Sequence, residues 1–221
     1  MSGWQPGGAP GGPAGGQPGG PAAATPRRRA WTDADSALWH TARILRSVAA
    51  GRLPEERVAT LFALRPGEVA FVAATFQLDS MRPLRDGGSA PYATPASASA
   101  SDTLGLARAG TWRPDFGGAL TVTNLGFYLV TPAGTFWWDW ASIDLMQVTA
   151  FNTVVLQGRS DRGVVTWRIY SLWAELIFVL WAQARHPNHP QLADGGWLPE
   201  HWAEWAARQG YPPPLPERTG G

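Results

Sequence analysis

Residues 119–140 read ALTVTNLGFYLVTPAGTFWWDW, and this stretch decides the fold that we predict from the sequence. Two runs rich in β-branched and aromatic residues, 119–123 and 127–131, are separated by the short turn 124–126, which contains asparagine and glycine. Such runs are typical of strands, and a glycine in a short loop permits the positive φ that many hairpin turns need. A third run, 135–140, follows a Pro-Ala-Gly turn. We therefore expect three consecutive antiparallel strands.

Further strands are predicted on both sides of this stretch. The runs share a short length, β-branched and aromatic residues and flanking turn residues; they are 69–78, 143–150, 154–157 and 164–170. In the last run, Val165, Trp167 and Ile169 alternate with polar residues, so one face of that strand would be core. The predicted fold class is a β-rich α+β domain over residues 66–186, with about six or seven antiparallel strands and a mobile loop over 80–107.

Two helices are predicted ahead of the strands, and together they would form a helical hairpin over residues 30–65. Asp33 or Asp35 can cap the first helix, in which apolar residues recur at helical spacing until Gly51 ends it. The second helix would begin at Pro54, since proline is favoured in the first turn of a helix.

One long apolar helix and one short helix are predicted after the strands. Residues 172–185 carry two neighbouring apolar stripes, so most of this helix must be covered, and the sheet is the obvious cover. Within the linker segment 187–210, a short helix is expected over 199–209. The two ends, 1–29 and 211–221, are rich in glycine and proline, so we expect a disordered N-terminal tail and a flexible C-terminal tail.

Composition narrows the class of protein. The net charge of +1 argues against an extended surface for phosphate backbones, so no nucleic-acid partner is expected. The chain has no cysteine, which excludes disulfides and thiolate chemistry and fits a reducing compartment. Residues 1–26 lack the apolar core of a secretory signal, and the longest apolar run, 176–182, is far shorter than the about 20 residues of a membrane helix. We therefore expect a cytoplasmic protein.

No combination of residues predicts catalysis or a cofactor. His186 and His189 could converge on a metal ion if they lay on a helix, but Pro187 and Pro190 interrupt the backbone there. No serine lies in a Gly-x-Ser-x-Gly turn, and the glycine-rich start lacks the features of a phosphate-binding loop. We expect no catalytic residue, no metal, no cofactor and no enzymatic activity.

The aromatic run at 136–140 is the first candidate for a binding surface. Strand alternation would place Trp138 and Trp140 on one face and Trp137 on the other. These three tryptophans are candidate protein-binding residues if Trp137 is left uncovered, because exposed aromatic patches mark interaction surfaces. The alternative is that the cluster packs in the core.

Four arginines are candidate lipid-binding residues. Arg82, Arg85, Arg108 and Arg113 lie at loose spacing around the first hairpin, and a guanidinium can bind phosphate through two hydrogen bonds. The alternative is that these arginines are scattered and solvated, since acidic residues lie among them.

Three short motifs resemble bacterial PH-like and GRAM-like domains, and the resemblance covers residues 64–186. Residues 64–69 lead into the first predicted strand, and residues 118–124 begin the predicted hairpin. Residues 140–143 join the aromatic run to the strand that follows it. The resemblance implies a PH-like barrel in which one C-terminal helix closes an open end of two packed sheets. The helical hairpin and the short last helix would be additions to that barrel.

These observations favour a binding protein, since thirteen tryptophans occur without a catalytic constellation. We expect a non-catalytic, bacterial protein-interaction or scaffold module that binds a protein or peptide through an aromatic groove or a sheet edge. The alternative is a peripheral membrane adaptor that binds anionic lipid head groups through the candidate arginines and the basic run 27–29.

Overall fold

The computed structural model describes residues 29–55, 57–83, 110–160 and 163–215, and the described residues from Trp31 onward form one compact unit. The strands are β1 (Ala70–Pro83), β2 (Gly110–Thr123), β3 (Gly126–Thr131), β4 (Gly134–Asp139), β5 (Ile143–Ala150), β6 (Thr153–Ser160) and β7 (Gly163–Tyr170). The helices are α1 (Asp33–Ala49), the short 3-10 helix η2 (Trp140–Ser142), α3 (Ala174–Arg185), α4 (Pro190–Ala193) and α5 (Trp202–Arg208).

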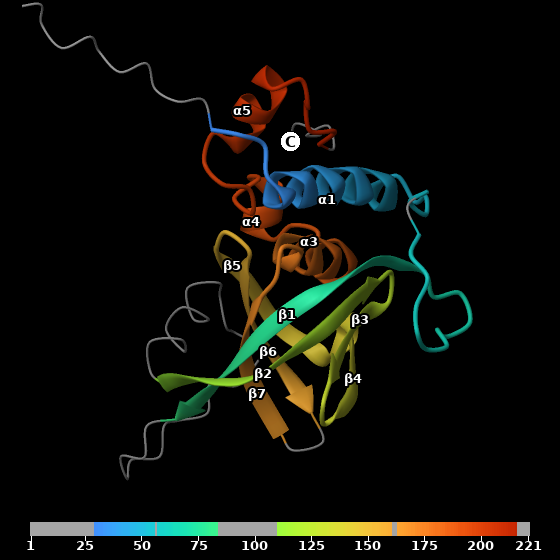
Figure 1. The fold of residues 1–221 in the computed structure, drawn as a ribbon, viewed down its shortest axis with the longest axis vertical. Coiled ribbons are helices and arrows are strands. Elements are labelled where there is room, and N and C mark those ends of the chain that lie inside the picture. The colour runs from blue at the N-terminus through green and yellow to red at the C-terminus, as the bar shows by residue number, and fades with distance from the viewer. Residues whose placement is uncertain (1–28, 56, 84–109, 161–162, 216–221) are drawn as a thin grey trace, which may run out of the picture. The chain divides into compact units, whose positions relative to one another are not determined.

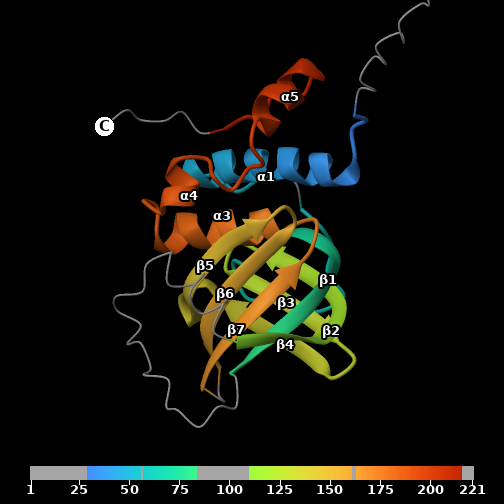
Figure 2. The same ribbon diagram turned by 90° about the vertical axis from the view of Figure 1, so that its left-hand side faces the viewer.

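The seven strands form one antiparallel sheet in the order β4-β3-β2-β1-β7-β6-β5. Strands adjacent in sequence pair with each other except β4 and β5, which lie at opposite edges, and the pairing of β1 with β7 joins the early and late strands. Figure 2 shows that the sheet is strongly curled. The prediction of a β-rich, barrel-like domain of about six or seven antiparallel strands is confirmed. The order also leaves β4 and β5 as the two edge strands.

The turn between β2 and β3 is held by a buried hydrogen-bond network. Thr123 Oγ1 accepts from the backbone amides of Leu125 and Gly126, each at 3.1 Å, and donates to Glu68 Oε1 at 2.7 Å. Tyr128 donates to Glu68 Oε2 at 2.7 Å. Burial alone would raise the pKa of Glu68, but the hydrogen bonds that it accepts hold that pKa below its usual value. The network joins the start of β1 to the predicted hairpin.

The interior of the curled sheet is crossed by the indole of Trp138, which extends from β4 toward β6. A Cβ atom added at Gly158 on β6 would lie 2.6 Å from Trp138 Cζ3, so glycine leaves the room that the indole occupies. Trp138 also packs edge-on against Trp167 of β7, with ring centroids 4.7 Å apart. This contact joins the edge strand β4 to β7 across the interior of the sheet.

Helix α3 lies between the sheet and α1, as Figures 1 and 2 show. All residues from Ala174 to Ala182 are buried. The prediction that most of this helix is covered holds, but the sheet supplies only one side and α1 supplies the other. The N-cap of α1 is Thr32, whose side chain accepts from Asp35 N while Asp35 accepts from Thr32 N, so neither predicted aspartate is the cap.

The predicted helical hairpin over 30–65 is wrong in its second member. Residues 52–55 and 57–69 contain no helix, and two side chains of this stretch contact β3 and β4 instead. The ring of Phe62 lies 4.5 Å from that of Tyr128, and the Arg65 guanidinium lies 3.2 Å above the ring of Trp137. Packing on the sheet therefore overrides the local preference for a helix.

Two further boundaries differ from the predictions. Strand β1 continues through Pro83, because its second half pairs with β2 from Thr111 to Pro114, so the predicted loop cannot begin at residue 80. The rest of that loop, 84–107, lies outside the described residues, as do residues 1–28 of the predicted tail 1–29 and residues 216–221 of the predicted tail 211–221. Helix α4 forms within the predicted linker, and α5 is shorter than expected.

An aromatic cluster joins the C-terminal segment to α1. The Trp31 ring stacks on Trp205 and on Tyr211, with centroid separations of 5.4 and 4.4 Å. Trp202 Nε1 donates a 2.9 Å hydrogen bond to the fully buried carboxylate of Asp35. In these contacts, the tryptophans pack the C-terminal segment against the start of α1 and do not form a separate binding surface. Among the described residues, no helix is long and apolar enough to span a bilayer.

Candidate functional site

The three candidate protein-binding tryptophans do not form an exposed patch. Trp138 and Trp140 are each 5 % exposed and belong to the core. Trp140 lies in η2 rather than in a strand, and its Nε1 donates to Asn124 O at 3.0 Å. Trp137 is on the opposite face, where Arg65 covers its ring. Core packing, the alternative that the sequence left open, therefore accounts for Trp138 and Trp140.

The structure describes one candidate lipid-binding side chain of the four. Arg113 is exposed on β2, and Arg82 is described only by its backbone, which pairs with Thr111. Arg85 and Arg108 lie outside the described residues. Lipid binding through these arginines stays a prediction.

The edge of β5 offers a different site, because part of its backbone has no neighbouring strand. Gln191 of α4 occupies the edge at Val148: Val148 N donates to Gln191 Oε1 at 3.1 Å, and Gln191 Nε2 donates to Val148 O at 2.8 Å. Val148 therefore points its backbone groups away from β6. The pairing with β6 is regular from Met146 to Val148, and in an antiparallel pair the backbone groups of successive residues point alternately toward and away from the partner strand. The N–H and C=O of Met146 therefore point to the same side as those of Val148, away from β6.

The Met146 backbone lies between two occupied positions of that edge. On one side Gln191 holds Val148, and on the other Trp181 Nε1 donates to Ile143 O at 3.1 Å. The described residues provide no partner for the Met146 N–H and C=O at this edge. An unpaired donor and acceptor on an edge strand can pair with another extended chain. Met146 is 1 % exposed, so a chain that pairs with these groups must displace the residues that cover them.

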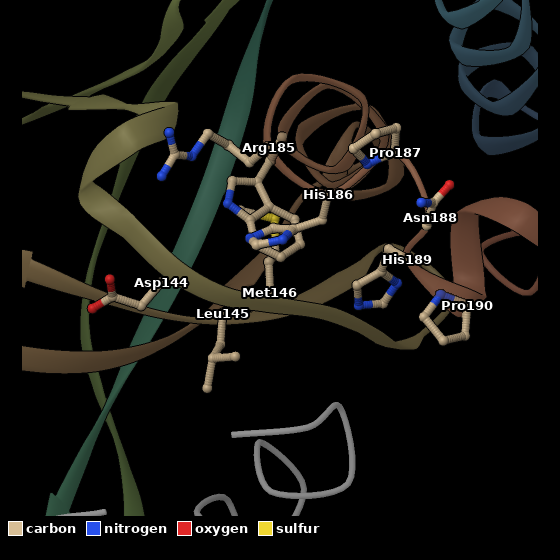
Figure 3. A pocket seen from close by; sticks show the side chains of 10 residues that line it. Asp144, Leu145, Met146, Arg185, His186, Pro187, Asn188, His189 and Pro190 are labelled. Carbon is tan, nitrogen blue, oxygen red and sulfur yellow. The ribbon is translucent and has the colours of Figure 1, made fainter. Parts of the chain in front are cut away.

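A pocket of about 450 Å³ lies beside this part of β5, between the strand and the loop after α3. Figure 3 shows Met146 at its floor, with Asp144 and Arg185 on one side and His189 and Pro190 on the other. Its lining is formed by Asp144, Leu145, Met146, Trp181, Arg185, His186, Pro187, Asn188, His189 and Pro190. The pocket thus combines an apolar floor with polar groups at the rim.

The rim of the pocket carries positive charge. The Asp144 carboxylate is engaged by Arg159 Nε at 3.0 Å, and the Arg185 side chain is exposed. Desolvation lowers the pKa of both His186 and His189, and the neighbouring Arg185 and His186, respectively, lower these pKa values further. Both imidazoles are therefore neutral near neutral pH, and Arg185 is the cation available to a ligand.

One histidine of the pocket holds a neighbouring backbone group. His189 Nδ1 accepts from Gln191 N at 3.2 Å, so one imidazole has a structural role at the start of α4. No group of three or more His, Cys, Asp or Glu side chains in the described part of the chain could hold a metal ion. The sequence drew attention to these histidines but not to the site, because which strand forms a sheet edge depends on strand order.

Comparisons of the chain with protein-family models, with curated proteins and with solved structures give no significant match. The resemblance to PH-like and GRAM-like domains therefore stays a prediction, carried by the three short motifs.

Proposed function

We propose that this protein is a non-catalytic protein-interaction module of PH-like fold that binds an extended peptide segment along the edge of β5. The observation that carries the proposal is the position of β5 at the edge of the sheet, beside a pocket of about 450 Å³ that Met146 lines. A bound segment would continue the sheet through main-chain hydrogen bonds, and its side chains would enter the pocket. Two antiparallel meanders, β1–β4 and β5–β7, followed directly by α3, support the PH-like assignment.

The chemistry of the rim favours a segment that carries an acidic side chain. Arg185 presents a guanidinium that can accept a carboxylate in two parallel hydrogen bonds. The one carboxylate of the rim, Asp144, already pairs with Arg159, which reduces its repulsion of an incoming anion. Leu145 and Pro187 supply apolar contact area beside the charge.

Selection of a random peptide library against the full chain, followed by hydrogen exchange measured by NMR, tests the proposal. In the free protein, the Met146 amide should exchange faster than the Gln147 amide, because alternation directs the latter toward β6. A selected acidic peptide should slow exchange at Met146. Arg185→Glu should weaken binding by about tenfold or more, the size expected for one charge-assisted hydrogen bond.

Arg52→Glu is the matched control, because Arg52 is exposed and does not line the pocket. It should leave the affinity unchanged. Selected peptides that bind without changing exchange at Met146, or that bind Arg185→Glu as well as the original protein, would contradict the proposal.

A further inference from the structure

Glu175, in the first turn of α3, is a buried carboxyl that the proposed peptide site does not use. Its side chain is 1 % exposed, and its Oε1 accepts the backbone amide of Asn152 at 2.7 Å. Asn152 has a φ of 59° in the turn between β5 and β6, so this hydrogen bond attaches a strained turn to the helix. One oxygen of Glu175 thus has a structural role.

The other oxygen of Glu175 has no such role. Glu175 Oε2 is buried, and no other described residue donates a hydrogen bond to it. The same is true of the neighbouring side-chain oxygen, Asn152 Oδ1. A carboxylate is an acceptor only, and an unpaired buried acceptor costs free energy of folding, so this oxygen requires a separate explanation.

Glu175 lines a second pocket, of about 180 Å³, which is distinct from the pocket beside Met146. Its lining is otherwise mostly apolar and is formed by Val148, Thr149, Ala150, Phe151, Gly196, Trp197, Leu198 and Pro199. The volume is several times the about 30 Å³ that one water molecule occupies in the liquid. Trp197 is buried, whereas Phe151 is 40 % exposed, so the pocket connects a buried acid with the surface.

We propose that this pocket binds a primary alkylammonium group, with Glu175 as its counter-ion and the apolar lining around its alkyl chain. An ammonium group is compact and carries three donors, which suits an acceptor that has no partner. Aromatic rings beside the acid favour a cation further. A divalent metal fits the pocket poorly, because calcium and magnesium need six or more oxygen ligands and this lining supplies one carboxylate.

The raised pKa of Glu175 is consistent with a cationic ligand in this pocket. Burial raises the pKa of Glu175 to about 7, even though the backbone hydrogen bond from Asn152 opposes the shift. A cation beside the carboxyl would favour its charged form and remove the energetic cost of burying that charge without a partner.

The test is a titration of the full chain with n-butylammonium at about pH 8, where Glu175 is mostly ionised and the amine is charged. Binding is followed by the NMR shifts of the Asn152 amide and the Trp197 indole. We expect saturable shifts at both groups, and binding at least about tenfold weaker for n-butanol and for the Glu175→Gln variant. Glu200→Gln, which removes an exposed carboxylate outside the lining, should bind as the original protein does.

A second titration distinguishes the two sources of the ammonium group. Binding of a blocked lysine tripeptide, lost when the lysine is Nε-acetylated, would assign the pocket to a lysine side chain; binding of butylammonium alone would assign it to small amines. The proposal is overturned if butanol and butylammonium shift the same resonances equally, if Glu175→Gln binds as tightly as the original protein, or if no local shift occurs. Glutamine keeps the volume and one carbonyl acceptor for Asn152 N, and the spectrum itself reports whether the variant is folded.

Discussion

Replacing Glu175 with glutamine should change how the stability of this protein depends on pH. Burial raises the pKa of Glu175 from 4.5 to about 7 in the folded chain, whereas the unfolded chain keeps the ordinary value. The folded state therefore binds this proton more tightly. Its stabilising contribution is fully present below pH 4.5 and is lost as the pH rises through about 7.

The size of the effect follows from the two pKa values. At about 1.4 kcal/mol for each pKa unit, the loss between pH 4.5 and the folded pKa near 7 amounts to roughly 3 kcal/mol. Because Glu175 is 1 % exposed, solvent screening reduces this figure little. Glutamine cannot ionise, so the stability of Glu175→Gln relative to the original protein should increase by that amount from about pH 4.5 to about pH 8.

Urea unfolding at a series of pH values, monitored by tryptophan fluorescence, measures this difference. Subtracting one protein from the other cancels the titration of groups that both share, such as Glu68. Glu200→Gln is the control, because its carboxylate is exposed and should give a nearly constant difference across the series. A difference between Glu175→Gln and the original protein that does not change with pH would refute the assignment of a buried, largely unpaired acid.

Three other perturbations probe the packing of the sheet. Gly158→Ala should destabilise the fold by about 1–3 kcal/mol in urea unfolding, because the new methyl group would overlap the Trp138 indole. Asp79→Ala should cost roughly 1–3 kcal/mol, since it leaves the partly buried Arg168 without the carboxylate that its Nε contacts at 3.1 Å. Burial and a carboxylate partner raise the pKa of Tyr128 to about 12, so Tyr128→Phe should remove a late-titrating phenol from the ultraviolet absorbance titration.

For each of these three variants, one experimental result would contradict the prediction. Full stability of Gly158→Ala would contradict the close packing at this position, because the new methyl group would meet both the Trp138 indole and the Ser142 backbone oxygen, at 2.6 and 2.7 Å. An Asp144→Ala variant should lose less than about 1 kcal/mol, because its partner Arg159 is 63 % exposed; a loss equal to that of Asp79→Ala would contradict the difference in burial. If Tyr128→Phe instead removes a phenol that titrates near its ordinary pKa of 10.0, the buried hydrogen bond to the carboxylate is absent.

Much of the sheet could be predicted from the sequence because its signals are local. The hairpin around Gly126 depends on turn chemistry and on two short apolar runs, and both lie within a few residues of each other. The strand Ile143–Ala150 was predicted at its observed bounds for the same reason. The uniformly apolar pattern of 172–185 also indicated a helix buried on several sides.

Other features depend on contacts that the sequence does not encode locally. The apolar spacing after Pro54 matches a helix, yet Phe62 and Arg65 pack on Tyr128 and Trp137, residues more than sixty positions away in the chain. Strand alternation predicted that Trp137 and Trp138 lie on opposite faces of the strand. It did not predict that the Arg65 guanidinium covers Trp137 or that the Trp138 indole reaches Gly158. Tertiary packing decides between such alternatives because each local preference is worth only a fraction of a kcal/mol to about 1 kcal/mol.

The sequence by itself determined that this protein contains a β-rich, antiparallel domain followed by a buried helix, because hydrophobic period and turn residues are properties of adjacent positions. Only the tertiary structure decided where the candidate sites lie. Met146 lies at the sheet edge because strand order places β5 there, and Glu175 faces a pocket because α3 meets the turn at Asn152. Both sites arise where segments distant in sequence meet, and no local pattern specifies such a meeting.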